Sequence, residues 1–470
     1  MVMTANIPKH AGGRTVRSGA GVRDLKGLAQ PHHALAAASL PIPVLIYLIA
    51  VVLPVGMQVG PLMLTALRLV LMVMVIPVMV GVLTGRHGRV FATDILFTAH
   101  IAWSTVALAM NNPEMVVEQM GSVGIEFLGG YFMGRAYIRN AEHFGALCRA
   151  LVVIVCCMAP FALFETLTGR PLILEVIRAG GFRTVPFNYQ DQRLGLDRVQ
   201  MSFAHPIHFG LFCSVIFSLS FVAMEGMVGT ARRFLVSGLI AACGFLALSS
   251  GALLAIALQF GLIAWALIFS TTKHRWWYLV ALFAVTYVVI DILSNRTPIQ
   301  VFLSYATFSS HTAYWRAQIF EWGMKNVWMN PVFGLGFKDW IRPWYMYSGS
   351  MDNFWLVMAV RYGIPGFLTV TIGYVLVVYH ILRRNFEGDL TLTQFRRAWV
   401  FTFLGLSFTL CTVHIWTNIY SFVFFILGAG VWLIKAAPRH PSSDEAPIAA
   451  DEVQGRRAST RYTRFTPVDR

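Results

Sequence analysis

The sequence predicts an all-α, polytopic integral membrane protein with about twelve transmembrane helices. Hydrophobic types make up 57% of the 470 residues and charged types only 13%, which is too apolar for a soluble globular protein of this size. Apolar runs long enough to span a bilayer follow one another along most of the chain. The short connections between them are alternately basic and neutral or acidic. These observations exclude most soluble enzyme folds.

The membrane domain is expected to occupy residues 37–437, with one apolar run for each span. The polar, basic residues 1–36 and the charged residues 438–470, which contain Pro and Ser, are expected to be flexible cytoplasmic tails. The seventh and eighth runs are divided only by the Ser-Ser-Gly of residues 249–251. The runs lie near 38–56, 61–84, 90–110, 120–138, 145–168, 203–224, 234–250, 251–270, 277–294, 353–382, 397–416 and 418–436.

The distribution of Lys and Arg predicts that both chain ends are cytoplasmic. If residues 1–36 face the cytoplasm, every short connection on that side is basic, as cytoplasmic loops tend to be; residues 85–89 and 231–233 are examples. The outer connection at residues 111–118 is neutral or acidic. The net charge of +15 is therefore interpreted as a topology signal, and no nucleic-acid partner is expected.

Two outer segments, residues 169–202 and 295–352, break this pattern because basic residues outnumber acidic ones in each. One interpretation is a solvated loop of mixed charge. The other is a binding site for an anionic group, since an Arg side chain can hold phosphate with two parallel hydrogen bonds. Charge alone does not separate the two interpretations.

The second outer segment is rich in aromatic residues. Residues 311–329 have the apolar spacing of an amphipathic helix, and Asn330-Pro331 ends it. Tryptophan and tyrosine rings either anchor such a helix at the membrane interface or offer flat apolar faces to sugar rings. The candidates for glycan stacking are Trp315, Trp340, Trp344 and Tyr345.

Four motifs follow one another across residues 195–370. They are Arg198 with His205-Pro206 at the start of a span, Arg316 in the aromatic helix, an N-P-x-x-G-x-G turn at residues 330–336, and Asp352-Asn353 followed by G-x-x-G at residues 363–366. In this order, and on the outer face, they resemble the signature of the O-antigen ligase and Wzy-type polysaccharide polymerase superfamily.

This resemblance implies an all-helical, GT-C-like membrane glycosyltransferase with a large periplasmic loop between spans nine and ten. Members transfer a glycan from an undecaprenyl-pyrophosphate-linked donor to an acceptor hydroxyl at the periplasmic face of the bacterial inner membrane, and use neither a metal nor another cofactor. The implied partners are the lipid-linked oligosaccharide donor, the glycan acceptor, the lipid bilayer, and chain-length regulator or export proteins.

The resemblance also assigns roles to individual residues. By position, Arg198 and Arg316 match the loop arginines that hold the donor pyrophosphate. Either Asp352, for which a positioned carboxylate is suitable, or a histidine takes the proton from the acceptor hydroxyl. The catalytic candidates are Asp352, Asn353 and His205, and the pyrophosphate-binding candidates are Arg193, Arg198, Arg316 and Arg361.

Structural roles stay open for some polar residues near the spans. Arg361 is equally suited to pair with a buried acid such as Asp291 or Glu126, because ionisable groups inside a membrane usually face a partner or a cavity. His205 has packing as its alternative role. His414 stands in an apolar run and is expected to be a packed histidine.

Two positions depart from the family pattern. Many ligases have His at the first position of the Asp352-Asn353 motif, and the Asp in this chain favours a polymerase over a ligase. Residues 249–251 are Ser-Ser-Gly where many relatives have Ser-Arg-Gly. Phosphate binding by that arginine therefore falls to Arg193, Arg198 or another cation of the outer loops.

The function expected first is a polymerase of O-antigen or exopolysaccharide repeat units. The alternative within the superfamily is an O-antigen ligase, which uses the lipid A core as acceptor. The alternative from another class is a secondary transporter or flippase, which would place polar groups near the membrane midplane in two corresponding halves. The sequence has no matching pair of halves but one outer loop rich in arginine and aromatic residues, which favours the enzyme.

Overall fold

The computed structural model describes residues 38–60, 62–295, 301 and 310–438. The two expected tails lie outside the described residues, apart from residue 438, and so do residues 296–300 and 302–309 of the second outer segment. Within the described ranges almost all regular structure is helical. The expectation of a mostly helical, polytopic chain is confirmed at that level.

Helices and two short strands succeed one another along the described chain. In order they are α2 (Ile42–Val52), β1 (Gly56–Val59), β2 (Leu62–Thr65), α3 (Ala66–Leu83), α4 (Ala92–Asn111), η2 (Pro113–Met115), α5 (Val116–Tyr137), α6 (Ala141–Thr168), α7 (Leu172–Ala179), α8 (Pro206–Phe221), α9 (Thr230–Leu246), α10 (Ser250–Ile268), α11 (Arg275–Leu293), α13 (Ser310–Met329), α14 (Phe354–Leu382), α15 (Leu390–Leu410), α16 (Thr417–Gly430) and η3 (Val431–Ile434).

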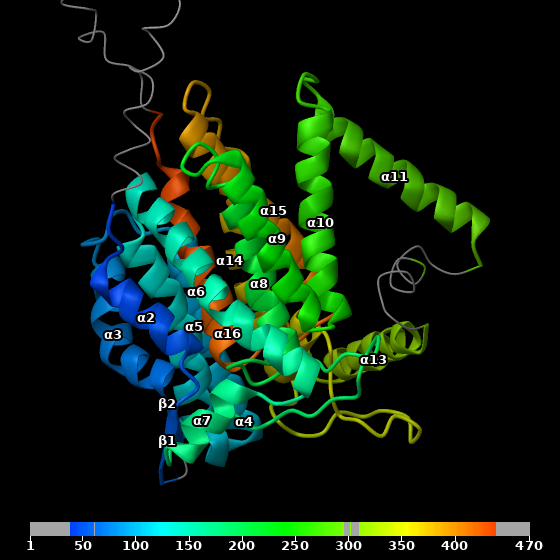
Figure 1. Cartoon of the computed structure of the whole chain (residues 1–470). Helices are drawn as coiled ribbons and strands as arrows, with labels where there is room; N and C mark the ends of the chain where they lie inside the picture. The colour runs from blue at the N-terminus through cyan, green and yellow to red at the C-terminus, as the bar shows by residue number, and fades with distance from the viewer. Residues whose placement is uncertain (1–37, 61, 296–300, 302–309, 439–470) are drawn as a thin grey trace, which may run out of the picture.

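The long helices run back and forth between two ends of the molecule (Figure 1). The start of α2, the end of α16 and the connections after α10 and α14 lie at one end, which is called the basic end because the basic connections gather there. The β1–β2 hairpin, α7 and α13 lie at the other, called the loop end. The alternation follows the order of the apolar runs.

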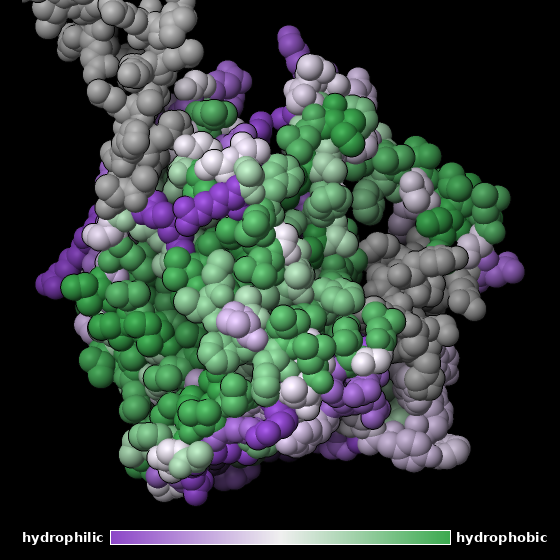
Figure 2. Space-filling model, in the orientation of Figure 1, coloured by the Kyte–Doolittle hydropathy of each residue, from purple (hydrophilic) through white to green (hydrophobic). Residues whose placement is uncertain are grey.

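Seven helices of the described part are long and apolar enough to cross a membrane. Hydrophobic side chains cover the middle of the face shown in Figure 2, and hydrophilic ones gather towards the two ends. This distribution is that of a membrane protein. The count of twelve spans stays a prediction, since α2 and α8, for example, are apolar but shorter.

The first expected span, 38–56, contains a helix of only 11 residues. Pro41 precedes α2 and Pro54 follows its end, and a residue before proline is pushed away from the helical conformation. The chain then forms the antiparallel β1–β2 hairpin, in which Gly56 lies opposite Thr65. The amide of Gly56 also donates to the carbonyl of Arg183 at 2.9 Å, which ties the hairpin to the long connection before α8.

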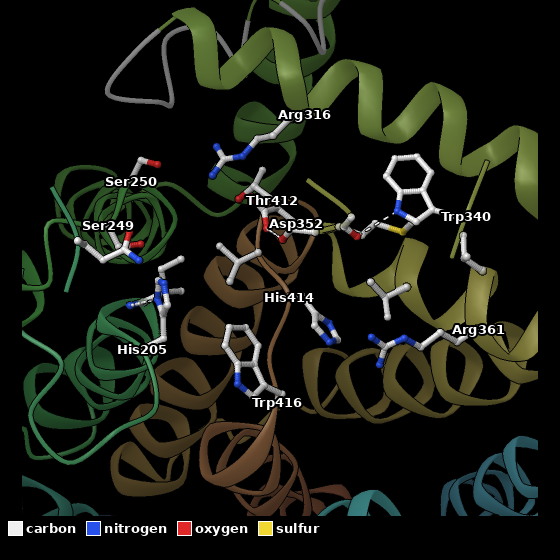
Figure 3. Close-up of a pocket in the computed structure, with 18 of the residues that line it drawn as sticks. His205, Ser249, Ser250, Arg316, Trp340, Asp352, Arg361, Thr412, His414 and Trp416 are labelled. Carbon is white, nitrogen blue, oxygen red and sulfur yellow. Dashed lines mark hydrogen bonds between the residues drawn. The ribbon is translucent and has the colours of Figure 1, made fainter. Parts of the chain in front are cut away.

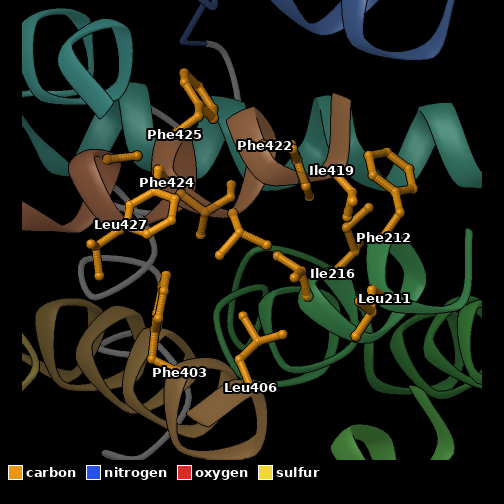
Figure 4. Packing of buried hydrophobic residues seen from close by; sticks show 14 of the residues in the cluster. Leu211, Phe212, Ile216, Phe403, Leu406, Ile419, Phe422, Phe424, Phe425 and Leu427 are labelled. Atoms are coloured by element: carbon orange, nitrogen blue, oxygen red, sulfur yellow. The ribbon is translucent and has the colours of Figure 1, made fainter. Parts of the chain in front are cut away.

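The centre of the bundle is α16, whose apolar side chains pack against α8 and α15 (Figure 4). Its other side meets α5 so closely that a Cβ at Gly134 would overlap the carbonyl oxygen of Phe425. Small residues at such crossings let two helix backbones approach, and close packing is what holds membrane helices together.

Two arginines inside the bundle are paired with buried carboxylates. Arg68 Nε lies 2.8 Å from Glu126 Oε1, and Arg135 Nε lies 3.5 Å from Asp94 Oδ1. The hydroxyl of Tyr131 donates to the same Asp94 oxygen at 2.6 Å. Glu126 is therefore the partner of Arg68, and among the described residues neither Glu126 nor Asp291 pairs with Arg361.

Helix α14 is broken at Gly363, where φ is +71° and ψ is −179°. The break leaves backbone groups without partners inside the helix, and the turn at residues 330–336 satisfies them. The amides of Leu335 and Gly336 donate to the carbonyls of Val360 (2.7 Å) and Arg361 (3.0 Å), and the Ile364 amide donates to the carbonyl of Pro331 (2.7 Å). The N-P-x-x-G-x-G and G-x-x-G motifs therefore form one unit.

We expect Gly363→Ala to destabilise this unit. Backbone at these angles is almost confined to glycine, and an added Cβ would overlap the carbonyl oxygen of Val332. The loss in free energy of unfolding is expected to be roughly 2–5 kcal/mol. It is measured by denaturant titration of the purified protein in detergent.

The matched control is Gly181→Ala, because Gly181 also has a positive φ, +85°, but nothing lies within 4 Å of an added Cβ. It shares the backbone strain and lacks the overlap, so its loss of stability is expected to be smaller. Equal losses in the two variants would contradict the packing argument.

Candidate functional site

A cavity of about 950 Å³ lies at the loop end of the bundle. Its walls come from five parts of the chain: the connection before α8, the start of α10, α13 with the segment after it, the first turns of α14, and the connection between α15 and α16. Figure 3 shows His205 and the serines at the start of α10 on one side, Arg316 above, and Arg361 opposite. Segments far apart in sequence therefore share one hollow.

Arg193 and Arg198 are positioned by the loop-end terminus of α9. The carbonyl of Leu248 accepts from Arg193 Nη1 at 2.8 Å, and the carbonyl of Ala247 accepts from Arg198 Nε at 3.4 Å. Carbonyls at a helix C-terminus carry partial negative charge and favour cations. Glu165 on α6 holds the connection in place, because its carboxylate accepts from the backbone amides of Gln200 and Met201.

The two arginines lie next to residues 249–251, which are Ser-Ser-Gly. Ser249 and Ser250 line the cavity beside the carbonyls that bind Arg193 and Arg198. Cationic groups from the connection before α8 therefore lie beside the start of α10.

Positive charge is concentrated in the cavity. Burial and the neighbouring Arg193 lower the pKa of Arg198 to about 10. The pKa of Arg316 is lowered by burial and by Arg193, and Asp352 opposes that shift. Lowered arginine pKa values mean that the cations are crowded and desolvated, so a bound anion would be strongly stabilised there.

These arginines form few interactions with acidic groups of the protein. Within the described ranges, neither Arg198 nor Arg316 forms an ion pair with a carboxylate, and the buried Nε of Arg316 has no hydrogen-bond partner. Arg198 donates instead to the neutral side-chain oxygen of Gln190 at 3.0 Å. An unmatched buried donor is costly, and a negatively charged ligand would remove that cost.

The opposite wall adds two further cations. Arg361 stands in α14 just before the break, and its guanidinium lies 4.5 Å from the centre of the Phe337 ring. Lys338 is the next residue after Phe337. Its Nζ lies 3.5 Å from the Oδ1 of Asn111, at the end of α4. The unit formed by the turn and the broken helix therefore fixes the place of both charges.

Asp352 and Asn353 have different positions. Asp352 is exposed on the cavity wall, where the hydroxyl of Ser350 donates to its Oδ1 at 3.1 Å. Asn353 is not part of the wall, and its Oδ1 accepts from the Leu356 amide at 3.0 Å, which caps the start of α14. The adjacent Phe354 amide donates to the carbonyl of Val413. Asn353 thus orients the segment that presents Asp352.

His205 also caps a helix. Its Nδ1 accepts from the Ile207 amide at 3.1 Å at the start of α8, so the proton of the neutral ring is on Nε2. Burial, with Arg198 and Arg193 nearby, lowers the pKa of His205 to about 4. A histidine in this state is a hydrogen-bond donor to the cavity, because its acceptor nitrogen is already used.

Of the four expected stacking residues, only Trp340 lines the cavity. It is 6% exposed, and its Nε1 donates to the carbonyl of Gly349 at 3.0 Å. Trp315 and Tyr345 lie side by side outside the wall, with ring centres 6.2 Å apart. Trp344 is 84% exposed. These three rings are not part of the cavity wall, so the prediction that they line the site is not met.

His414 and Trp416 line the cavity although the sequence does not predict them as site residues. The expected span 397–416 is helical only to Leu410, and the following non-helical connection brings both side chains to the cavity. Burial and Arg361 lower the pKa of His414 to about 3. An apolar run gives no signal for such an early helix end, which is why the sequence favours a packed role for His414.

Comparison with known families adds an independent finding. Residues 235–371 match the family model described as O-antigen ligase. The chain carries an O-antigen ligase family domain. The assignment to the O-antigen ligase and Wzy superfamily, which the motifs predict, is thereby confirmed. No curated protein gives a significant match.

The matched O-antigen ligase domain covers less than a third of the chain. It contains Arg316, the turn, Asp352 and Arg361, but neither Arg198 and His205 upstream nor His414 downstream. The cavity therefore combines residues of the matched segment with residues on both sides of it.

The lowered pKa of His205 predicts how stability depends on pH. Between about pH 6.5 and 4 the unfolded chain binds a proton at this position and the folded chain does not, so the free energy of unfolding falls as the pH falls. His205→Asn keeps a capping oxygen and has no titrating group. Its melting temperature in detergent should therefore decline less steeply over this range than that of the wild type.

The comparison variant is His205→Ala, which loses both the proton site and the cap. As the pH falls, its melting temperature should decline as gradually as that of His205→Asn. It should also be lower than that of the wild type at every pH. A slope equal to that of the wild type in both variants would contradict the assignment of a neutral, buried His205.

Proposed function

We propose that this protein is a polymerase of O-antigen or exopolysaccharide repeat units that transfers an undecaprenyl-pyrophosphate-linked glycan to an acceptor sugar hydroxyl at the periplasmic face of the inner membrane. The observation that carries the proposal is the cavity in which arginines from separate segments meet, within reach of an O-antigen ligase family motif. Its cations suit a pyrophosphate, and its one unpaired acid is Asp352 among the described residues that line it.

In the proposal, the pyrophosphate of the donor binds between Arg198 and Arg316, with Arg193 behind them. Guanidinium groups are planar, permanently charged donors whose geometry matches phosphate oxygens. Held in fixed positions away from bulk water, they stabilise the negative charge that develops on the leaving group. Arg361, on the far wall, extends the positive field towards the reacting carbon.

The reaction step is a displacement at the anomeric carbon. The oxygen of the acceptor hydroxyl forms a bond to that carbon, and the bond from the carbon to the pyrophosphate oxygen breaks. The electron pair of the broken bond leaves with the pyrophosphate, and the hydroxyl proton passes to the carboxylate of Asp352, the general base. Attack from the face opposite the leaving group inverts the anomeric carbon.

Other residues act as positioning groups in this scheme. His205 donates from Nε2 to a phosphate or sugar oxygen, since its Nδ1 is occupied by the Ile207 amide. Trp340 is almost fully buried and supports the wall, and the neighbouring rings of Trp315 and Tyr345, outside the wall, are the groups proposed to stack on the glycan. Asn353 holds the start of α14 in register with Asp352.

The second candidate is an O-antigen ligase, which the description of the matching family model favours. The cavity chemistry is the same for both, because the donor and the leaving group are shared. Only the acceptor differs. Asp352, at a position where many ligases have His, is the feature that favours the polymerase.

The test uses a deletion strain complemented with wild type, Asp352→Asn or Arg316→Ala. Removing a general base is expected to lower the transfer rate roughly 100- to 10,000-fold, so the long chains should disappear in the Asp352→Asn strain. Arg316→Ala should do the same through loss of pyrophosphate binding. Surface glycans are analysed by lipopolysaccharide gels and an exopolysaccharide assay.

The matched control is Lys325→Ala, on the same helix as Arg316. Lys325 is exposed, pairs with Glu321 at 2.9 Å, and does not line the cavity, so its removal should leave the glycans unchanged. Membrane levels of each variant are compared by blotting, which separates lost chemistry from lost protein.

The pattern of loss distinguishes the candidate functions. If the long chains are lost but the lipid A core still carries a single repeat unit, the protein is an O-antigen polymerase. If the core carries no repeat units at all, the protein is a ligase. Loss of secreted polymer with normal lipopolysaccharide means exopolysaccharide assembly. Full rescue by both cavity variants would contradict the enzyme and favour the transporter or flippase.

A further inference from the structure

A second cavity, of about 630 Å³, lies at the basic end of the bundle, opposite the first. It is lined by the connection before α4, the end of α5 with the residues after it, the start of α6, the start of α15, and η3 with the residues after it. None of its residues takes part in the proposed reaction. Its chemistry therefore needs its own explanation.

Cationic side chains dominate its wall. Arg89, Arg135, Arg139 and Lys435 line it against a single carboxylate, Asp389. Arg135 is committed to the bundle, since it pairs with Asp94 and donates to the carbonyl of Arg89 at 2.7 Å.

The other three cations are differently placed. Arg89, Arg139 and Lys435 are exposed, and none of them forms an ion pair with any described residue. The Oδ1 of Asp389 accepts from the Leu392 amide at 2.9 Å, where it caps α15. The wall therefore offers three cationic groups that an external anion can reach.

The backbone adds to this positive field. Phe91, Asn140 and Asp389, the residues that precede α4, α6 and α15, all line the cavity, so three long helices begin at it. Helix N-termini carry partial positive charge and attract anions. The pKa of His87 on the same wall is lowered by burial and by Arg139, Arg135 and Arg86, in agreement with a crowded positive site.

One side of the cavity is apolar. Phe91 faces it, with the ammonium of Lys435 5.9 Å from the ring centre, and Val431 and Trp432 complete that side. The buried Nε1 of Trp432 has no hydrogen-bond partner among the described residues. A ligand with a charged group, an oxygen acceptor and an apolar part satisfies all of these features.

We propose that this cavity binds the phosphodiester headgroup of an anionic phospholipid of the surrounding bilayer. The site lies at the ends of membrane helices, at the level where lipid headgroups lie, and basic pockets between such helices suit these headgroups. The phosphate sits among Arg89, Arg139 and Lys435. The glycerol end of the lipid lies along Phe91 and Trp432. This inference does not depend on the proposed function.

The test uses the full-length protein in detergent, titrated with phosphatidylglycerol or phosphatidylcholine and followed by native mass spectrometry. The wild type should bind phosphatidylglycerol about tenfold more tightly than phosphatidylcholine, and the double variant Arg89→Gln with Arg139→Gln should lose that preference. The control is the double variant Arg232→Gln with Arg383→Gln. It removes the same charge from exposed residues at the same end that do not line the cavity, and should keep the preference.

Three outcomes would overturn the proposal. The first is equal binding of the two lipids by the wild type. The second is an unchanged preference in the Arg89–Arg139 variant, whose folding is checked by its melting temperature in phosphatidylcholine. The third is displacement of the lipid by glycerol phosphate at equal concentration, which would assign the site to a free phosphate compound instead of a membrane lipid.

Discussion

The break of α14 at Gly363 is the constraint on which the candidate site depends. Carbonyls freed inside a membrane helix must find donors, because no water is present to replace them. In this chain the turn at residues 330–336 supplies the amides, and the indole of Trp103 donates to the carbonyl of Tyr362 at 2.9 Å. The start of the connection that leads to Asp352 and the helix that carries Arg361 are thereby joined into one unit. A segment without regular structure can hold charged groups in place only with such support.

The second organising feature is the contrast between charges inside the bundle and charges at its ends. Arg68 and Arg135 have acidic partners within the helices, where an unpaired charge would be costly. At both ends, cations gather in cavities with few acids. Unpaired cations are less costly there than in the apolar middle of the bundle. One cavity suits a pyrophosphate, and the other suits a lipid phosphate.

The motifs carry structural and chemical roles in adjacent residues. Asp352 faces the cavity while its neighbour Asn353 caps α14, and His205 both caps α8 and lines the cavity. The family resemblance groups all three as catalytic candidates, since a motif does not reveal which of its members faces the substrate. The arginines are easier to predict, because an unpaired guanidinium on the outer side of a membrane protein has few structural uses. Of the aromatic candidates only Trp340 reaches the wall.

The sequence by itself determined the membrane class, the order of the helices, the helix over residues 311–329 and the superfamily, because hydropathy, charge and short motifs are local properties of the chain. Tertiary structure decided which side chains share a cavity. His414 reached it because α15 ends at Leu410, and Arg193 is held there by the carbonyl of Leu248 just after α9, a contact across 55 positions. Such placements depend on where helices end and cross, which is set by packing between distant segments and leaves no local pattern.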